Sequence, residues 1–449
     1  MRKKLLRRLA LICATAVLTC GLAGCGNAAS ETPSSSAVPA VETTVFEPKL
    51  DTEKEVTLDV AGFFGNFEAL DQVLNAFNEY YPNVTISYEQ NSGDKMVEYL
   101  KNNPYADIFM ADDTNVRYPD WVDSYVADQC VDLLDAGIDV SAVRPELMKE
   151  YTFDGKLRIL PFAQNRAGMV VNKTLLEKEG LSVPTNYEDF LTTLEALKQA
   201  GYTPIQGPEG SIYANLTYNM AMTMLGTDPE FLEALNAGNE SAVEKLTPVF
   251  EKIEELKEKG YIDSDVNAEY PADNYDSAIL KFFEGDVPFW VCNTEKYSGM
   301  KKRESKSETF SASPFEYAFV DVPLGDDGVY EYIEPWCGFS INKNSEDYDY
   351  AVEFLRFMAQ DEQLNTIASV KGVPAVTNNS TDSRFDDMNA QPQVASSYIN
   401  DGTIMNHMKD YFNMAAGSYG KGDIASPEEA ARSYVERCAE TAQEMAAAK

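Results

Sequence analysis

The stretch of sequence that decides the fold is DGKLRILPFAQNRAGMVVNKTLLEKEGLSVPTNYEDFLTTLEALKQAGYTPIQ, residues 154–206. An apolar run at 157–162 predicts a short strand, and a second apolar run at 169–171 predicts another. The polar segment 163–168 lies between the two runs. Two strands joined by a polar, partly extended segment suit a chain that crosses from one lobe of a protein to another.

A helix is expected in the second half of this stretch. Residues 185–188, which follow Pro184, have the T-x-x-E pattern of a capping box that begins at Thr185. Four apolar residues then share one helical face: Phe190, Leu191, Leu194 and Leu197.

Strands and helices alternate in the part of the chain that precedes this stretch. Three apolar runs up to residue 110 predict strands, and helical spacing follows the first of them. This alternation indicates parallel βαβ units in an open, doubly wound sheet, whose ligands lie beyond the carboxyl ends of the strands. The turn that contains Phe64 and the pair Asp112 and Asp113 are strand ends of this kind.

The later part of the chain gives further elements and a second crossing. Thr247 and Pro248 predict the start of a helix that ends at Gly260. Residues 286–291 and 317–322 predict strands, and residues 330–341 a second passage between lobes.

Length and charge limit the classes of protein. A chain of 449 residues exceeds the size at which a single hydrophobic core stops growing, so two lobes are expected. The formal net charge of −36 indicates a soluble protein and excludes nucleic acid as a partner, because phosphates would be repelled.

The first 25 residues have the features of an export signal. A basic segment precedes the apolar run 9–22, which is too short for a membrane span and ends in Leu22-Ala23-Gly24-Cys25. This ending resembles the lipobox of bacterial lipoproteins, which implies that a signal peptide of residues 1–24 is removed and that Cys25 is lipidated. An ordinary signal peptide with a chance cysteine is the alternative.

Residues 25–54 are rich in Ser, Thr, Pro, Ala and Glu and show no apolar period. This composition predicts a disordered, lipidated tether. The tether would hold the folded part at the outer face of the cell membrane.

The order of short motifs along residues 55–445 resembles the maltose-type family of extracellular solute-binding proteins, family 1, which serve ABC sugar importers. The crossing 154–173 and the segment 183–205 carry the resemblance most specifically. Further matching segments are 105–109, 283–290, 351–355 and 372–374. Three positions depart from the usual residues of the family: Val171, Pro288-Phe289 and residues 157–159. These departures leave the fold as expected, but they affect the prediction of the ligand class.

The resemblance implies an α/β, two-lobed periplasmic-binding-protein-like fold of type II, in which each lobe is a mostly parallel sheet flanked by helices. The N-terminal lobe would comprise residues 55–163 and 336–376, and the C-terminal lobe residues 164–335 and 377–449. It further implies a monomer without catalytic activity or cofactor. Such a protein captures a carbohydrate, an oligosaccharide, between two closing lobes and delivers it to the transmembrane permease subunits.

A sugar site needs aromatic rings that stack on apolar C–H faces and polar groups that bond the hydroxyls. The resemblance places stacking residues at Trp290 and Trp336, and Phe64 is a third candidate, with core packing as the alternative for each. The polar candidates are Asp112 and Asp113 after a strand, Asn165 and Arg166 in the first crossing, and Glu334 in the second. Trp121 and Tyr213 are additional candidates, with packing as the alternative.

Other chemistries find less support in the sequence. The single histidine, His407, has no nucleophile motif nearby, and no sequence feature selects a pair of glycosidase carboxylates. The segment 263–267 begins like a calcium loop, but Ala268 and Asn274 stand where Gly and Glu are required. Cys130, Cys292, Cys337 and Cys438 are too scattered for a zinc site. A secreted glycoside hydrolase, a binding protein for a non-sugar solute and an adhesin or chemoreceptor partner remain as alternatives.

Overall fold

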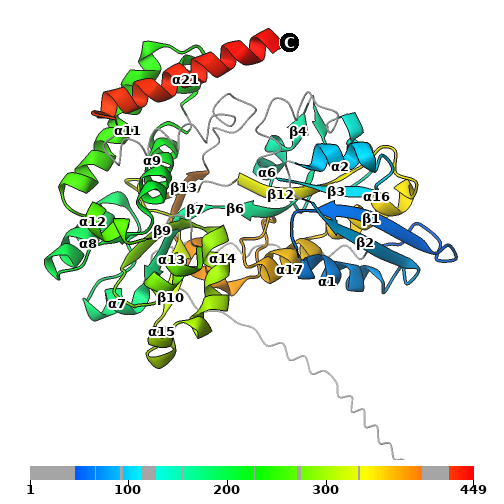
Figure 1. Cartoon of the computed structure of the whole chain (residues 1–449), viewed down its shortest axis with the longest axis horizontal. Helices are drawn as coiled ribbons and strands as arrows, with labels where there is room; N and C mark the ends of the chain where they lie inside the picture. The colour runs from blue at the N-terminus through cyan, green and yellow to red at the C-terminus, as the bar shows by residue number, and fades with distance from the viewer. Residues whose placement is uncertain are drawn as a thin grey trace, which may run out of the picture. The chain divides into compact units, whose positions relative to one another are not determined.

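The computed structural model describes residues 46–65, 67–91, 95–112, 128–153, 155–226, 228–270, 275–331, 334–396 and 424–448. The chain divides into two compact units, residues 1–46 and 47–449, and the helices and strands described below belong to the second unit (Figure 1). None of the described helices is long and apolar enough to span a bilayer.

The first sheet has five strands in the order β2-β1-β3-β12-β6. β1 pairs in parallel with β2 and β3, whereas β12 runs antiparallel to β3 and β6. Its strands are β1 (Val56–Gly62), β2 (Val84–Gln90), β3 (Ile108–Asp112), β6 (Leu160–Asn165) and β12 (Glu334–Ile341). Helices around this sheet are α1 (Glu68–Phe77), α2 (Met96–Asn102), α6 (Pro145–Glu150), α16 (Tyr348–Met358) and α17 (Asp361–Lys371) (Figure 1).

The second sheet has four strands in the order β10-β7-β9-β8, and β7 runs antiparallel to both of its neighbours. Its strands are β7 (Ala167–Asn172), β8 (Ile205–Gln206), β9 (Phe289–Asn293) and β10 (Tyr317–Val320). The helices that follow or cover it are α7 (Lys173–Lys178), α8 (Tyr187–Gln199), α9 (Glu209–Leu225), α10 (Pro229–Asn236), α11 (Glu240–Glu258), α12 (Ser264–Ala268), α13 (Tyr275–Phe282), α14 (Thr294–Arg303), α15 (Glu308–Ala312), α18 (Asp386–Asn389) and α21 (Pro427–Ala448).

Short elements complete the described chain. β4 (Thr152–Phe153) pairs with β5 (Lys156–Leu157), and β11 (Val329–Glu331) pairs in parallel with β13 (Gln393–Ser396). Two single turns of 3₁₀ helix are η2 (Glu304–Lys306) and η3 (Ser383–Phe385).

The first crossing between the sheets is tighter than the sequence predicts. The expected polar segment 163–168 is largely strand, and Arg166 alone separates β6 from β7. Strand structure extends to Asn165 because Gln164 and Asn165 pair with Pro335 and Glu334 of β12. The two sheets are therefore linked through a single residue at this point.

Glycines allow a close approach of strands on both sides of this crossing. A Cβ on Gly168 would lie 2.5 Å from the carbonyl oxygen of Val320, and one on Gly338 would lie 2.4 Å from that of Leu160. Both distances are below any real Cβ contact, so only glycine fits these strands as they are paired.

The helix predicted to start at Thr247 begins instead at Glu240, and Pro248 lies inside it. The hydroxyl of Thr247 donates to the carbonyl oxygen of Val243 rather than capping a helix end. Apolar residues on both sides of the proline, from Ala242 to Leu256, belong to one buried core cluster that includes residues of α21. This burial outweighs the hydrogen bond that the proline removes.

Four cysteines lie in the described part of the chain, and all are buried without forming a disulfide: Cys130, Cys292, Cys337 and Cys438. Burial raises the pKa of the thiols of Cys130 and Cys438 to about 12. Cys292 and Cys337 lie within β9 and β12 and therefore belong to different sheets.

Residues 47–54, within the range that the sequence assigned to the tether, are hydrogen-bonded to the first sheet's helices. The backbone N–H of Lys49 donates to the Tyr81 hydroxyl (2.8 Å) and to the Glu353 carboxylate (3.0 Å). The Tyr81 hydroxyl in turn donates to Glu353 over 2.6 Å. The compact unit thus begins before residue 55.

The N-cap of α8 is Asn186, one residue after the expected Thr185. The Asn186 side-chain oxygen accepts from the backbone N–H of Asp189 over 2.9 Å, whereas the Thr185 hydroxyl reaches only the Asp189 side chain, at 3.3 Å. We predict that Asn186→Ala lowers the free energy of unfolding by about 1 kcal/mol, because a backbone donor loses its partner. Urea unfolding checks this value.

Thr185→Ala is the matched control, since Thr185 is exposed and caps no backbone group. Its expected effect is below about 0.5 kcal/mol. A larger effect for Thr185→Ala than for Asn186→Ala would show that Thr185 is the N-cap, as the sequence predicts.

Candidate ligand-binding site

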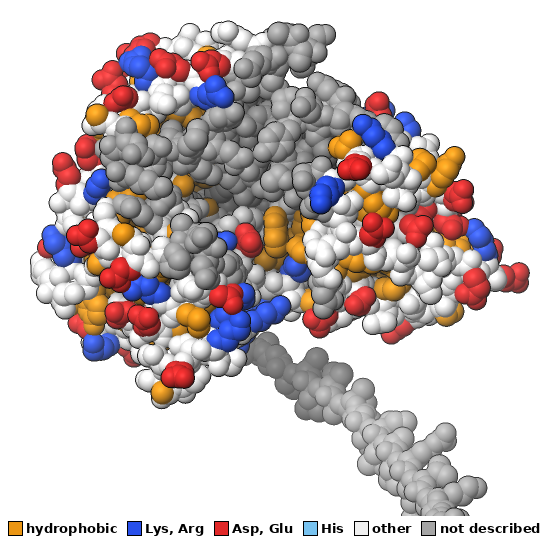
Figure 2. All heavy atoms as spheres, in the orientation of Figure 1, with side chains coloured by type: hydrophobic (Ala, Val, Ile, Leu, Met, Phe, Trp, Pro, Cys, Tyr) orange, Lys and Arg blue, Asp and Glu red, His pale blue; other side chains and the backbone are white. Residues whose placement is uncertain are grey.

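Two aromatic side chains meet at the edge of the first sheet where a ligand is expected. Phe64 follows β1, and Trp336 lies in β12 next to Cys337, which pairs with Asp112 at the end of β3. Both side chains are partly buried, and their ring centroids are 5.6 Å apart at 70°. The structure therefore brings these two predicted residues together beyond the carboxyl ends of β1 and β3. Figure 2 shows hydrophobic side chains gathered in a hollow near the middle of the face drawn.

A base of buried rings supports this aromatic pair. The ring of Phe67 lies 5.0 Å from that of Phe64 and 5.5 Å from that of Phe162 in β6. The Tyr88 hydroxyl donates to the backbone carbonyl of Phe64 over 2.9 Å. Because Phe64 is held on both its ring and its backbone, its exposed face is preorganised for stacking.

A lysine that sequence reasoning missed joins the pair. Lys371 is the last residue of α17, and its Nζ lies 3.3 Å from the ring centroid of Phe64 and 5.4 Å from that of Trp336. Burial lowers the pKa of this ammonium. The sequence signal was only a Lys before Gly372, which is typical of an ordinary helix C-terminus.

Thr294, the first residue of α14, forms hydrogen bonds with the first crossing. The Thr294 hydroxyl donates to the side-chain oxygen of Asn165 (3.0 Å) and accepts from the backbone N–H of Arg166 (3.0 Å). The backbone N–H of Thr294 donates back to the Arg166 carbonyl over 2.9 Å. Asn165 is partly buried, and its oxygen serves this internal contact.

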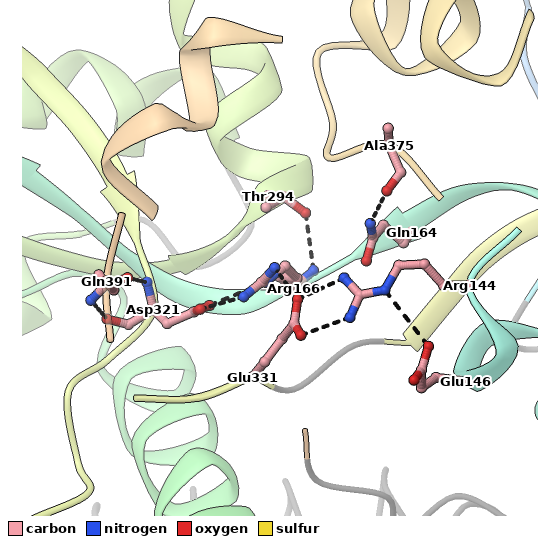
Figure 3. Close-up of polar contacts among 9 residues, drawn as sticks. All are labelled: Arg144, Glu146, Gln164, Arg166, Thr294, Asp321, Glu331, Ala375 and Gln391. Atoms are coloured by element: carbon pink, nitrogen blue, oxygen red, sulfur yellow. Dashed lines mark hydrogen bonds and ion pairs between the residues drawn. The ribbon is translucent and has the colours of Figure 1, made fainter. Parts of the chain in front are cut away.

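Arg166 is buried and bound to two carboxylates of its own chain (Figure 3). Its Nε and Nη2 donate to Asp321, which follows β10, and its Nη1 donates to Glu331 of β11 over 2.6 Å. Arg144, directly before α6, donates to both oxygens of Glu331 at 2.7 Å each. We call Arg144, Arg166, Asp321 and Glu331 the crossing network.

Neighbouring amides complete this arrangement. Gln391 accepts from the backbone N–H of Asp321 (2.8 Å) and donates to its carbonyl (3.0 Å), and the Gln164 side chain donates to the carbonyl of Ala375 (Figure 3). All three nitrogens of the Arg166 guanidinium are thus engaged within the protein. The sequence prediction of a ligand contact at Arg166 finds no geometric support here.

Trp290 packs in the core, which was the alternative to a role in ligand stacking. Its side chain is 1% exposed, and its ring stacks on Phe282 at 6.0 Å and 29° within a buried cluster. Tyr213 is likewise buried, in the core that includes α9 and α11. Asp113, Trp121, His407 and Cys25 lie outside the described residues, as do the side chains of Asp112 and Glu334.

The acidic segment at 263–267 acts as a helix cap. The Asp263 side chain accepts from the backbone N–H groups of Asp265 and Val266 at the start of α12. In the described part of the chain no cluster of three or more His, Cys, Asp or Glu residues is arranged to hold a metal ion.

A cavity of about 650 Å³ lies between α14, β10 and α18. Its charged lining is largely paired within the protein: Lys173 binds Asp387 at 2.9 Å, and Lys301 binds Glu304. The cavity therefore offers few open polar groups to a ligand, and it does not include Phe64 or Trp336.

Comparison with known proteins defines the class. Residues 72–396 match the profile of the family described as bacterial extracellular solute-binding protein. The chain belongs to this family and is a binding protein of a transporter rather than an enzyme. A search of curated protein sequences finds no significant match.

Solved structures of solute-binding proteins share the fold. The binding protein MsmE of Bacillus subtilis, in an open conformation, is 17% identical, covers 89% of this chain and 100% of its own, and has a TM-score of 0.67. A sugar transporter protein of Bacillus licheniformis in complex with stachyose is 19% identical and covers 85% and 98%, with a TM-score of 0.57. A binding protein of an ABC transporter from Bifidobacterium animalis in complex with mannobiose is 15% identical and covers 90% and 99%, with a TM-score of 0.60. These likenesses confirm the predicted two-lobed α/β fold. The sheets are mixed rather than mostly parallel as predicted, because β7 and β12 each run antiparallel to both of their neighbours.

The contribution of the crossing network to the free energy of unfolding can be tested by mutation. Glu331 is 3% exposed and binds two arginines, so Glu331→Gln leaves both guanidinium groups beside a neutral amide. We predict a loss of about 3 kcal/mol in the free energy of unfolding, because buried charges lose their partner. Denaturant unfolding followed by circular dichroism measures it.

The control variant is Glu440→Gln, which removes an exposed carboxylate paired with Arg437. Its expected cost is below about 1 kcal/mol. Equal effects of the two variants would show that the crossing network does not stabilise the fold.

Proposed function

We propose that this chain is the lipid-anchored, extracellular binding component of an ABC importer and that it captures an oligosaccharide between its two lobes. The observation that carries the proposal is the Phe64–Trp336 pair, partly exposed on a fixed aromatic base at a sheet edge. The complexes of similar structures with stachyose and mannobiose support a carbohydrate as the ligand class.

The physical reason is the complementarity of aromatic rings to sugars. A pyranose presents an apolar C–H face, and a preorganised ring buries that face at little cost in side-chain entropy. The T-shaped arrangement of Phe64 and Trp336 offers two differently oriented faces to adjacent sugar units. Polar side chains near the strand ends, Asp112 and Asp113 among them, would bind the hydroxyls.

Closure of the lobes follows from the chain crossings. We assign the N-terminal lobe to residues 55–163 and 336–376 and the C-terminal lobe to residues 164–335 and 377–449. The single-residue link at Arg166 and the entry into β12 are points about which a hinge motion can occur. The closed monomer would then dock on the permease and release the ligand to it.

Isothermal titration calorimetry of the mature protein against a panel of oligosaccharides tests the proposal. We expect binding by at least one saccharide and a loss of about tenfold or more, roughly 1.4 kcal/mol, for Phe64→Ala and for Trp336→Ala. Tyr105→Ala is the control, since Tyr105 is 61% exposed and contacts neither ring of the pair, and its affinity should equal that of the unmodified protein.

Three outcomes would contradict the proposal in different ways. Undiminished affinity in both variants would show that the aromatic pair only packs the core. Absence of binding by any saccharide would exclude a sugar ligand and leave another solute. If chromatography shows that the oligosaccharide is consumed during incubation, the protein is a glycoside hydrolase.

The lipid anchor is tested separately. Because the thiol of Cys25 is the expected acceptor of lipid, Cys25→Ser should release the protein from the membrane fraction. Fractionation and immunoblotting measure this, with the distant Cys438→Ser as the control that stays membrane-bound. Retention of Cys25→Ser in membranes would favour another mode of attachment.

A further inference from the structure

Lys371 is a partly buried cation that lies on aromatic rings instead of beside a carboxylate. Its Nζ is 3.3 Å from the centroid of Phe64, 5.4 Å from that of Trp336 and 5.8 Å from that of Phe67. Within the described part of the chain its ammonium makes neither a hydrogen bond nor an ion pair. Its three N–H donors therefore have no oxygen acceptor from the described part of the protein.

This absence is unexpected in so acidic a chain. Acidic residues outnumber basic ones by 73 to 37. Two other partly buried lysines have carboxylates in contact: Lys173 binds Asp387 at 2.9 Å, and Lys245 binds Asp228 at 2.6 Å. Lys252 lies over a single ring, that of Tyr187, at 4.6 Å, whereas Lys371 lies among three. Among the described residues no acid forms an ion pair with Lys371, which leaves its ammonium able to take an anionic group of a ligand.

The protein's own charges compensate Lys371 only in part. Burial lowers its pKa, Lys302 lowers it further, and Glu295 raises it without forming an ion pair with it. The carbonyl groups at the end of α17 and the faces of the rings attract the cation. Removal of a charge from water costs more than such contacts return, so an anion at this position would be strongly favoured.

We propose that the ligand is an oligosaccharide that carries a carboxylate, such as one containing uronic acid, and that Lys371 binds this carboxylate beside the Phe64–Trp336 pair. This inference rests on the proposed function, since it names the class of sugar for the same site. Lys371 is then the residue that determines specificity for charge.

The position of the ammonium explains the selectivity. Nζ lies 3.3 Å from the ring centroid of Phe64, so a sugar that stacks on the same face of this ring must displace the ammonium. A neutral sugar breaks the cation–π contact and returns no charge to the lysine. A uronate replaces that contact with a charge-assisted hydrogen bond, which is stronger. An amino sugar would place a second cation beside the first and is excluded.

Calorimetry with matched ligands tests this inference on the mature protein. The probes are oligogalacturonate against galacto-oligosaccharide, glucuronic-acid-substituted against plain xylo-oligosaccharide, and a sulfated galacto-oligosaccharide. We expect at least one uronate to bind at least tenfold more tightly than its neutral counterpart, and its affinity to fall with added salt. Methyl esterification of the carboxyl groups should remove the difference.

Substitutions of Lys371 assign the preference to this residue. Lys371→Met should reduce uronate affinity at least tenfold and bring it close to that of the neutral sugar, whereas Lys371→Arg should keep the preference. Lys156→Met is the control: it removes an exposed lysine of β5 and should leave the ratio unchanged. Circular dichroism and thermal unfolding verify that each variant is folded.

The results separate this inference from the proposed function. Equal or tighter binding of neutral sugars would overturn the inference and leave a sugar-binding protein. A preference for the sulfated sugar would overturn the carboxylate assignment. Uronate preference retained in Lys371→Met would place the cation elsewhere. No binding by any saccharide would reject the proposed function itself. If Lys371→Met does not fold, the comparison of matched ligands on the unmodified protein still decides the charge preference.

Discussion

One buried arginine, one partly buried arginine and two buried carboxylates bind one another where the chain passes between its two sheets. Ionised groups in such a place stabilise a structure only when each finds its partner with good geometry. Arg166 meets this requirement by binding Asp321 and Glu331 together, and Glu331 meets it by binding Arg144 as well. The four residues come from four separate stretches of the chain, so their pairing fixes how these stretches lie against one another.

Because of this constraint, the polar groups at the crossing bind one another and are not available to a ligand. Arg166, Asn165 and Thr294 satisfy one another and the network, so the crossing is a structural joint whose donors are already used. Among the described candidate residues, Phe64, Trp336 and Lys371 of α17 meet at the edge of the first sheet and are not part of this network. The crossing therefore serves the structure, and the preorganised aromatic pair is left to serve the ligand.

The sequence predicted the fold well because periodicity and motif order are local signals. It predicted strands that correspond to β1, β2, β3, β6, β7, β9 and β10 but not β8, whose two residues give no periodic signal. It also named Phe64 and Trp336, which the structure brings together. It did not distinguish Trp336 from Trp290, because both lie in segments where the resembled family places stacking residues. Tertiary packing makes the difference, since the ring of Trp290 stacks on that of Phe282 in the core. It read Arg166 as a ligand contact because the partners, Asp321 and Glu331, are more than 150 residues away. Lys371 was missed for the same reason, since Phe64, the ring nearest to its Nζ, is more than 300 residues away.

Local ambiguity also produced two smaller errors. Thr185 and Asn186 are adjacent capping residues, and a shift of one position changes which side chain reaches the backbone of Asp189. Pro248 usually marks the first turn of a helix, but burial along α11 overrides that preference. In both cases the correct reading needed tertiary contacts that a window of neighbouring residues does not contain.

The buried cysteines have a consequence for the life of the protein outside the cell. An exported chain emerges unfolded, with thiols of ordinary reactivity and in surroundings that promote oxidation. Once the fold buries Cys292 and Cys438, the pKa of each thiol is raised, and the thiolate form that attacks disulfides becomes very rare. The order of events therefore decides the outcome: molecules that fold first stay reduced without any cellular reductant, and molecules that are oxidised first carry crosslinks that the native packing does not accommodate.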